Sequence, residues 1–134
     1  MSLENQEQIN RFLDKRNIFV VIGVSRDKMK YGAKVYLDLK NAGYKVYPIN
    51  PHADEIFGDK CYKKLENLPE KPDVVNIVVP PKLTMEIVKE CKLLNIQNVW
   101  MQPGSQSKEA INYCKKNNLI VLHDFCIILQ RSKK

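Results

Sequence analysis

The chain has 134 residues, of which 44% are hydrophobic, so it can form one domain with a buried core and is too short for two comfortable domains. Its longest apolar runs have the length of strands, which predicts no transmembrane helix, and its polar N-terminus lacks the hydrophobic region of a signal peptide. We therefore expect a cytoplasmic protein with one domain over residues 1–134, made of an N-terminal helix at 1–15 and a core at 16–127.

The formal net charge of +7 reflects 22 basic against 15 acidic residues, which favours anionic ligands in general. The lysines are scattered and no aromatic–basic interleaving accompanies them, so we do not expect nucleic acid as the ligand. The cysteines form no CxxC pair and lie within predicted elements, which favours buried free thiols over disulfides or a zinc site. They are Cys61, Cys91, Cys114 and Cys126. No metal site is expected.

The first part of the chain predicts a helix followed by a buried strand. Residues 3–15 carry an apolar stripe typical of a helix that covers one edge or one face of a sheet. Residues 18–22, IFVVI, form a run without polar alternation, as in a strand buried on both faces. Gly23 ends this strand, and because it lacks a Cβ it allows a tight turn and the close approach of a ligand.

A loop and a second helix follow this turn. The apolar spacing from Val35 to Ala42 predicts one buried helix face, and Gly43 is a suitable residue to end the helix. The loop at 24–30 supplies backbone amides, a hydroxyl and three cations close to the start of the helix. This arrangement is typical of a binding site for an anion, most simply a phosphate.

The middle of the chain is less regular. Residues 44–50 predict a second strand, in which Pro48 either ends the pairing or lies where no amide is needed. Beyond the turn at 50–52, we expect a helical turn at 54–57 and a short strand at 60–62.

The second half alternates strands and helices more clearly. Strands are predicted at 73–79, 97–101 and 119–122, helices at 82–94 and 107–117, and a further short element in the tail at 123–129. Ser107 is expected to cap the second of these helices. In the first of them an apolar set is expected to face the core, namely Leu83, Ile87, Val88, Cys91 and Leu94.

Strands that alternate with helices at this spacing predict parallel pairing through right-handed crossovers. The expected fold is therefore α/β, a Rossmann-like, doubly wound, mostly parallel sheet in a three-layer α/β/α sandwich. Ligands of such sheets bind outside the carboxyl ends of the strands. Four turns are expected to converge there, at 23–30, 50–52, 79–82 and 102–105.

The first turn lacks the features of a dinucleotide site. Such a site has GxGxxG at this turn and an acidic residue about twenty positions later. This chain has GVSRD with one glycine, and Asn50 precedes Pro51 at the end of the second strand. NAD is thereby disfavoured, whereas a 2′-phosphorylated cofactor such as NADPH, held by Arg26 or a neighbouring lysine, remains open.

Four motifs occur in the order GVSRD, YPINP, DVVNIVVPP and NVWMQPG. Together they resemble the small CoA-binding domain family, similar to the N-terminal domain of the succinyl-CoA synthetase alpha subunit, over residues 16–127. In that family the ADP part of CoA lies across the carboxyl ends of the strands, with the first turn at the phosphates. The resemblance implies that this chain binds coenzyme A or an acyl-CoA in the same way.

The resemblance also implies a role for residues in each of the four turns. At the phosphates it implies Gly23, Val24, Ser25 and Arg26, with Lys34 on the following helix as an aid. Beyond the second strand it implies Asn50 and Pro51. At the adenine or ribose it implies Val79, Pro80 and Pro81, and on the pantetheine side Gln102, Pro103 and Gly104.

Acyl-CoA synthetases resemble this chain only in their first domain, since their phosphohistidine and nucleotide-grasp module lie in further domains. We therefore expect a binding domain without catalysis of its own, which acts as a sensor, a carrier or a recruiting module. Two alternatives stay open, an NADP(H)-binding oxidoreductase or redox sensor and a subunit of a multi-chain acyl-CoA synthetase. The expected partner is a small nucleotide ligand, with a protein partner or a homo-oligomer also open.

No residue is assigned a catalytic role. His123 follows the last strand, but adjacent residues on an extended chain point to opposite sides, so a direct couple with Asp124 is not expected. Ser25 lacks a nucleophile elbow or a paired base and is interpreted as a hydrogen-bond donor. Cys126 is interpreted as a buried thiol, although a position near the thiol end of CoA would permit a mixed disulfide. Trp100 is expected to pack against a helix.

Overall fold

Five parallel strands form the sheet of this protein, in the order β2-β1-β5-β6-β7. A computed structural model describes residues 2–134. The strands are β1 (Ile18–Ile22), β2 (Lys45–Ile49), β5 (Val74–Ile77), β6 (Asn98–Met101) and β7 (Ile120–Leu122). β1 pairs with β2 on one side and with β5 on the other, so the strand order reverses at β1. This confirms the expected parallel sheet and places its topological switch point at the carboxyl ends of β1 and β5.

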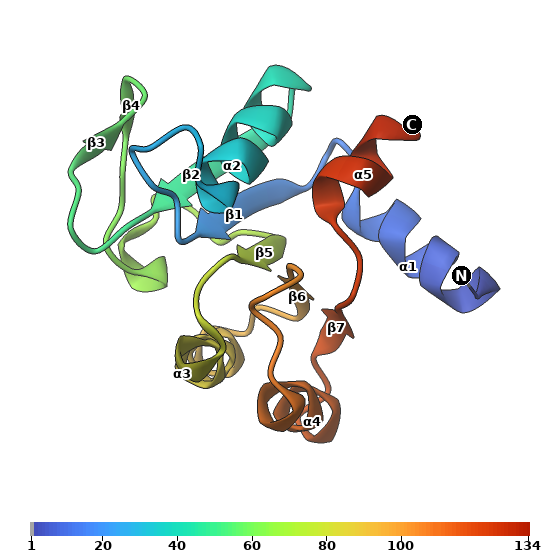
Figure 1. The fold of residues 1–134 in the computed structure, drawn as a ribbon. Coiled ribbons are helices and arrows are strands. Elements are labelled where there is room, and N and C mark those ends of the chain that lie inside the picture. The colour runs from blue at the N-terminus through green and yellow to red at the C-terminus, as the bar shows by residue number, and fades with distance from the viewer. Residues whose placement is uncertain (1) are drawn as a thin grey trace.

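Helices cover both faces of the sheet, which confirms the three-layer sandwich (Figure 1). One face carries α1 (Leu3–Phe12), α2 (Tyr31–Asn41) and α5 (Ile127–Ser132), and the other carries α3 (Pro81–Leu93) and α4 (Lys108–Lys116). Helix α1 is shorter than expected, and the tail forms α5 as its short element. Across residues 2–134, no helix has both the length and the apolar character needed to cross a membrane.

The strands are buried on both faces, as their apolar runs predict. Because successive side chains point to opposite sides, Phe19 belongs to the core under α1, α2 and α5, whereas Val20 belongs to the core under α3 and α4. Trp100 is fully buried, and its ring packs edge-on against Phe12 of α1 with the ring centroids 6.0 Å apart. The expected packing of Trp100 against a helix is confirmed.

The position of β2 at the edge of the sheet explains how it includes Pro48. The Pro48 carbonyl accepts a hydrogen bond from the Tyr62 amide at 3.0 Å on the outer side of the sheet. Because the amide and the carbonyl of one residue in a strand point to the same side, an amide at position 48 would also point outward, away from β1. The Asn50 amide then donates to the Tyr62 carbonyl at 3.0 Å. The strand continues through Pro48 because no sheet partner requires an amide there.

The expected helical turn at 54–57 is wrong, because this segment forms a β-hairpin. Phe57 and Gly58 form its turn with positive φ angles of 52° and 79°, which suit a two-residue hairpin loop. The Phe57 ring stacks on Tyr36 with the centroids 6.5 Å apart. An aromatic residue rarely adopts a positive φ, so the pattern did not indicate this turn. The hairpin strands are β3 (Glu55–Ile56) and β4 (Asp59–Lys60), followed by the 3-10 turn η1 (Leu65–Asn67).

Helix α3 turns a different face to the core from the one expected. Thr84, Val88 and Cys91 are fully buried. Leu83 and Leu94, which were expected to point inward, are 44% and 36% exposed. The prediction was wrong for these two residues because the buried stripe runs through Thr84, one position around the helix.

Two glycines fix the first turn through close backbone contacts. Gly23 has a φ of 106°, and a Cβ added there would lie 2.0 Å from the carbonyl oxygen of Val78, just after β5. A Cβ added to Gly32, in the first turn of α2, would lie 2.1 Å from the carbonyl oxygen of Gly23. The turn is therefore packed backbone against backbone between the end of β5 and the start of α2, and neither position has room for a side chain.

We predict that Gly32→Ala lowers the free energy of unfolding by about 2 kcal/mol through overpacking, although alanine favours a helix over glycine by about 1 kcal/mol. The new Cβ would overlap the Gly23 carbonyl, so α2 would have to move. Urea unfolding measures the difference, with Asn41→Ala at the exposed end of α2 as the control. A Gly32→Ala variant as stable as the parent would contradict the contact.

Candidate functional site

Two adjoining cavities lie outside the carboxyl ends of the strands, where the fold predicts a ligand site. The first, called here the apolar cavity, has a volume of about 320 Å³ and lies among the ends of β1 and β2, the segment around η1, and α3. The second, called the helix cavity, has a volume of about 420 Å³ and extends from the start of α2 to the turn after β6. Gly23, Ser25 and Val79 line both cavities, so the two meet at the first turn.

The start of α2 offers free backbone amides to the helix cavity. Lys30 is the N-cap residue, and its side chain makes no capping hydrogen bond. The Lys34 amide donates to the Lys30 carbonyl at 3.1 Å, and the amides at 31–33 have no acceptor within the helix. The first turn contains no acidic residue. The free amides, the helix dipole and the Lys30 charge together favour an anion at this position.

Side-chain hydrogen bonds shape the loop before α2. The Ser25 hydroxyl accepts a hydrogen bond from the Asp27 amide at 3.0 Å, and the Asp27 carboxylate accepts one from the Met29 amide at 2.9 Å. These bonds hold the loop in a fixed turn and leave the proton of the Ser25 hydroxyl free to donate to a ligand.

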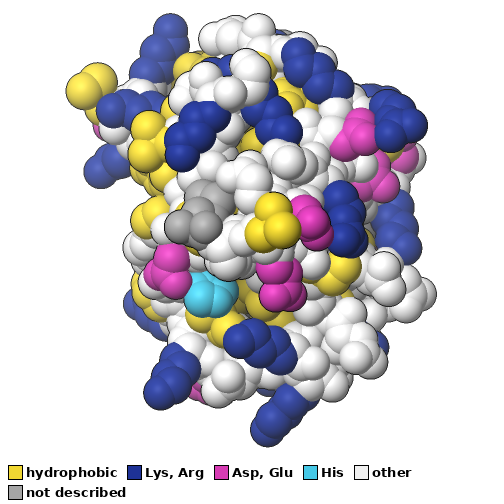
Figure 2. Space-filling view, turned by 90° about the vertical axis from the view of Figure 1, so that its right-hand side faces the viewer, with side chains coloured by type: hydrophobic (Ala, Val, Ile, Leu, Met, Phe, Trp, Pro, Cys, Tyr) yellow, Lys and Arg dark blue, Asp and Glu magenta, His cyan; other side chains and the backbone are white. Residues whose placement is uncertain are grey.

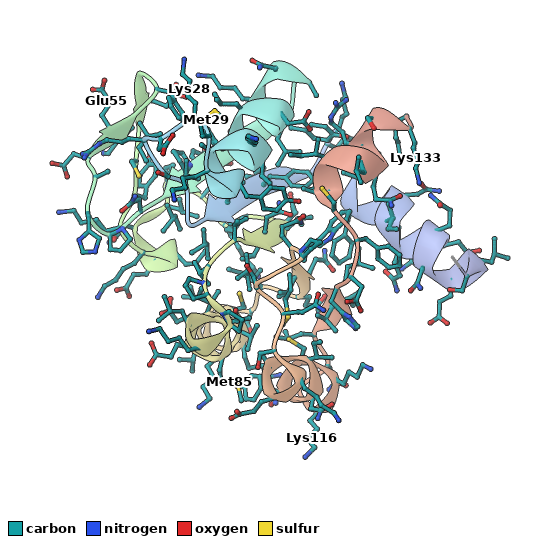
Figure 3. The ribbon with its side chains drawn as sticks, in the orientation of Figure 1. Lys28, Met29, Glu55, Met85, Lys116 and Lys133 are labelled. Carbon is teal, nitrogen blue, oxygen red and sulfur yellow. The ribbon has the colours of Figure 1, made fainter. Side chains whose placement is uncertain are left out.

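The cations of this loop are divided between the cavities and the hairpin. Lys28 lies over the Phe57 ring at 5.9 Å from its centroid, and Figure 3 shows it beside the hairpin that carries Glu55. Arg26 lines neither cavity, whereas Lys30 lines the helix cavity. The loop therefore brings one cation to the cavities instead of the three that its sequence offers.

Asn50 connects the end of β2 to the first turn. Its side-chain amide donates to the Val24 carbonyl at 2.9 Å, and its side-chain oxygen accepts a hydrogen bond from the His52 amide at 2.8 Å. Asn50 and Pro51 line the apolar cavity, while His52 is exposed. Asn50 thus fixes the relative position of two of the four turns.

Ser105 connects the turn after β6 to the turn after β5. Its hydroxyl accepts a hydrogen bond from the Val79 amide at 2.9 Å, and its carbonyl accepts one from the Thr84 hydroxyl at 2.6 Å. Ser105 is buried and lines the helix cavity. A serine in a turn has no distinctive pattern, so the sequence alone gave no reason to assign it this role.

Most residues implied by the family resemblance line one of the two cavities. In the apolar cavity these are Gly23, Val24, Ser25, Asn50, Pro51 and Val79. In the helix cavity they are Gly23, Ser25, Val79, Pro80, Pro103 and Gly104. Those that line neither cavity are Arg26, Lys34, Pro81 and Gln102.

Gln102 is fully buried and belongs to a polar network beneath the helix cavity. Its Oε1 accepts hydrogen bonds from the Ile127 amide at 2.9 Å and the Tyr31 hydroxyl at 3.2 Å, and its Nε2 donates to Asn76 at 3.3 Å. The Tyr31 hydroxyl also lies 2.7 Å from the Cys126 sulfur, and burial raises the pKa of Tyr31. Tyr31 lines the helix cavity and Gln102 does not. The Gln102 side chain is therefore connected to that cavity by its hydrogen bond with Tyr31.

Sequence reasoning missed one wall of the apolar cavity, formed by the segment before and into η1 and by α3. Its members are Lys63, Lys64, Leu65, Leu83, Glu86, Ile87 and Glu90. Leu83 and Ile87 follow helical spacing beside the buried stripe of α3, so an apolar surface wider than that stripe was the signal in the sequence for this part of the cavity. Burial raises the pKa of Glu90, and the charges of Glu66 and Glu86 raise it further.

His123 and Asp124 form a direct couple, which corrects the expectation that their side chains point apart. The His123 Nδ1 and an Asp124 carboxylate oxygen are 2.6 Å apart. Asp124 has a φ of 68°, so the chain turns here instead of staying extended. Hydrogen bonds from Gln106 and His123 hold the pKa of the Asp124 carboxyl below its usual value. Neither residue lines the cavities, so the couple does not face a ligand bound there.

The four cysteines are free thiols. Cys61, Cys91 and Cys114 are buried, whereas Cys126 is half-buried. Burial raises the pKa to about 12 for Cys91 and to about 11 for Cys114, which suppresses their reactive thiolate forms. Within residues 2–134, no group of three or more His, Cys, Asp or Glu side chains is placed to hold a metal ion.

Positive charge is mixed with negative charge over the surface seen in Figure 2. On that face Lys and Arg side chains are scattered among Asp and Glu side chains and do not form a continuous stripe. Some basic residues also form ion pairs, as Arg131 does with Asp38 at 2.6 Å. The net charge alone therefore does not mark this face as a surface for a polyanion.

Comparison with known proteins places this geometry in a family. A family model described as a CoA binding domain matches residues 17–132. The chain is 37% identical over 130 residues to the acetate–CoA ligase (ADP-forming) II subunit alpha of Pyrococcus furiosus, which covers 89% of this chain and 28% of that protein. It is 35% identical over 104 residues to the acetate–CoA ligase (ADP-forming) II of Archaeoglobus fulgidus, which covers 72% of this chain and 16% of that protein.

The chain thus spans less than a third of the length of these two curated relatives. Among solved structures, a hypothetical protein from Pyrococcus horikoshii OT3 has a TM-score of 0.90 at 30% identity. That likeness covers 96% of this chain and 90% of the other chain. The fold described here is therefore shared both with a domain of larger ligases and with a chain of similar size.

We predict that Asn50→Ala lowers the free energy of unfolding by about 1–2 kcal/mol, because the Val24 carbonyl and the His52 amide both lose a partner. Asn50→Asp keeps the acceptor for the His52 amide but turns a carboxylate oxygen toward the Val24 carbonyl oxygen, and these two acceptors repel, so it should be at least as destabilised as Asn50→Ala. Chemical denaturation of the three proteins measures this order. Equal stability of all three would show that Asn50 does not hold the turns together.

We predict that a thiol reagent such as Ellman's labels Cys126 first in the native protein and reaches Cys91 and Cys114 only after unfolding. The half-buried position of Cys126 and the raised pKa values of the other two set this order. The variant Cys126→Ser should lack the first phase of labelling. A first phase that survives in this variant would assign the accessible thiol to another cysteine.

Proposed function

Because this chain belongs to the CoA-binding domain family, we propose that it binds coenzyme A or an acyl-CoA through the ADP moiety at the carboxyl ends of the strands. The observation that carries the proposal is the pair of adjoining cavities that meet at Gly23, Ser25 and Val79. CoA has a nucleotide end and a long pantetheine arm joined by a pyrophosphate. A ligand with two ends suits two cavities that meet at an anion-binding turn.

In this proposal the pyrophosphate lies at the first turn, where Gly23 and Ser25 line both cavities. The free amides at the start of α2, together with Lys30, stabilise its charge. The adenosine occupies the apolar cavity, with Val24, Asn50, Pro51 and Val79 around it. The pantetheine arm follows the helix cavity past Pro103 and Gly104, and also past Pro80, which lines this cavity and not the apolar cavity to which the resemblance would assign it.

The residues that line neither cavity act at a distance in this proposal. Gln102 positions Tyr31 through its hydrogen bond, and Pro81 begins α3 beside Pro80. Arg26 and Lys34 add positive charge near the pyrophosphate without direct contact, a contribution that salt should screen.

We further propose that the domain binds its ligand without catalysing a reaction by itself. The His123–Asp124 couple lies outside both cavities, and the Ser25 hydroxyl accepts a hydrogen bond from a backbone amide and has no side-chain base bonded to it in the described residues. A second chain could supply the chemistry, since one relative is named as the alpha subunit of an ADP-forming acetate–CoA ligase. In that case thioester formation from ATP would require the mixture of both chains.

An NADP(H)-binding oxidoreductase is the alternative from a different class. It would use the same first turn, with a cation at the 2′-phosphate. The end of β2 carries Asn50 and no carboxylate for ribose hydroxyls, which does not favour NAD, and Arg26 lies outside both cavities.

We predict that CoA and acetyl-CoA raise the midpoint of thermal unfolding by several degrees, because a ligand at a hundred times its dissociation constant adds about 2.7 kcal/mol to stability. ADP should give a smaller shift, since it lacks the pantetheine arm, and NAD should give none. Differential scanning fluorimetry at matched concentrations measures this order. A shift with NADPH alone would overturn the CoA proposal in favour of the oxidoreductase.

A further inference from the structure

We propose that Lys63 and Lys64 form a second anion subsite, at the rim of the apolar cavity, which receives the 3′-phosphate on the ribose of CoA. This inference rests on the proposed function, because it names the part of the ligand that the apolar cavity recognises. The 3′-phosphate distinguishes CoA from dephospho-CoA, ADP and NAD. The subsite would therefore decide which adenine nucleotide the protein selects.

The cations that line the apolar cavity are Lys63 and Lys64, and no other basic residue among those described lines it. Lys30 lines only the helix cavity, and Arg26 lines neither. The basic loop before α2 therefore places no cation in the lining of the apolar cavity. The positive charge of that cavity comes from a different segment of the chain, the one that enters η1.

Both lysines are available to bind a ligand. The Lys63 Nζ lies 3.6 Å from an Asp54 carboxylate oxygen and the Lys64 Nζ 3.9 Å from a Glu66 carboxylate oxygen, and the lysine side chains are 59% and 67% exposed. Exposed ion pairs at such distances hold their partners weakly. A phosphate that bridged both ammonium groups would replace these loose contacts with direct charge-assisted hydrogen bonds.

The backbone that carries the lysines is fixed on both sides. Tyr62, immediately before them, exchanges backbone hydrogen bonds of 3.0 Å with Pro48 and Asn50 at the end of β2. Leu65, immediately after them, is buried in the core under α3. The two ammonium groups therefore extend from an anchored segment at the cavity rim, which limits the entropy lost when they bind an anion.

The part of the apolar cavity that α3 forms is acidic, and it sets the orientation of the ligand. Glu86 and Glu90 lie one helical turn apart on α3 and both line the cavity. Their carboxylates repel a phosphate and accept hydrogen bonds from amino groups such as the 6-amino group of adenine. The ligand that suits both the lysines and the carboxylates is an adenosine with its base toward α3 and its ribose phosphate toward Lys63 and Lys64.

Isothermal titration calorimetry with CoA and dephospho-CoA tests this subsite in the parent protein and in the double variant Lys63→Ala/Lys64→Ala. We expect the variant to lose about tenfold or more in affinity for CoA, because charge-assisted contacts are removed, and to bind dephospho-CoA within about twofold of the parent, because that ligand lacks the phosphate. Lys71→Ala is the matched control, since this exposed lysine on the same connection lines neither cavity. Lys63→Arg/Lys64→Arg should keep the preference for CoA.

The titrations with CoA and dephospho-CoA test the Lys63–Lys64 subsite separately from the proposed binding of CoA. A double variant that keeps the parent's preference for CoA over dephospho-CoA would overturn the subsite, as would an equal loss in Lys71→Ala, which would indicate a general effect of charge. A parent protein that binds CoA and dephospho-CoA equally would also overturn the subsite and leave the proposed function standing. A parent protein that binds neither ligand would overturn both. An unchanged thermal midpoint of each variant without ligand shows that the fold is intact.

Discussion

The backbone of Gly23 lies between the end of β5 and the first turn of α2, and the binding surface is built outward from that contact. A Cβ at Gly23 or at Gly32 would come within about 2 Å of a carbonyl oxygen, so the two turns can approach only as bare backbone. The approach brings the free amides of α2 to the switch point of the sheet. Asn50 and Ser105 then attach the turns after β2 and β6 to the same centre. A ligand would meet a rim that is already assembled, which lowers the entropy cost of binding.

The charged residues are distributed so that each cavity favours a different chemical group of the ligand. The helix cavity combines Lys30 with the free amides of α2 and suits an anion close to the backbone. The apolar cavity has lysines from the segment before η1 and carboxylates from α3. Such a distribution favours a ligand that carries phosphate at two separate places on a ribose and an uncharged base directed toward α3. The net charge of +7 would speed the encounter with an anionic ligand, whereas the local arrangement would select it.

The sequence predicted the features that depend on short-range patterns, namely the apolar strands, the alternation with helices, the switch point and the turns that converge there. It failed where the decisive contact forms only in the folded chain, or where one unusual backbone angle sets the geometry. The contact of Gly32 with Gly23 needs the helix docked on the sheet, and the hairpin turn at Phe57 needs Tyr36 beneath it. Leu83 was expected in the core because helical spacing cannot distinguish a face that packs on a sheet from one that lines a cavity. The His123–Asp124 couple depends on one positive φ, which sequence alone did not indicate.

In the proposed complex one ligand occupies both cavities and crosses the first turn between them. The most direct measurement is the change in backbone amide chemical shifts when CoA is added to isotopically labelled protein. We predict the largest changes at Gly23, Ser25, Gly32 and Val79, with further changes around both cavities. The proposed complex would be contradicted if those amides stayed unchanged and the largest changes lay elsewhere, for example in the groove that Tyr47 and Lys60 line along the outer edge of β2.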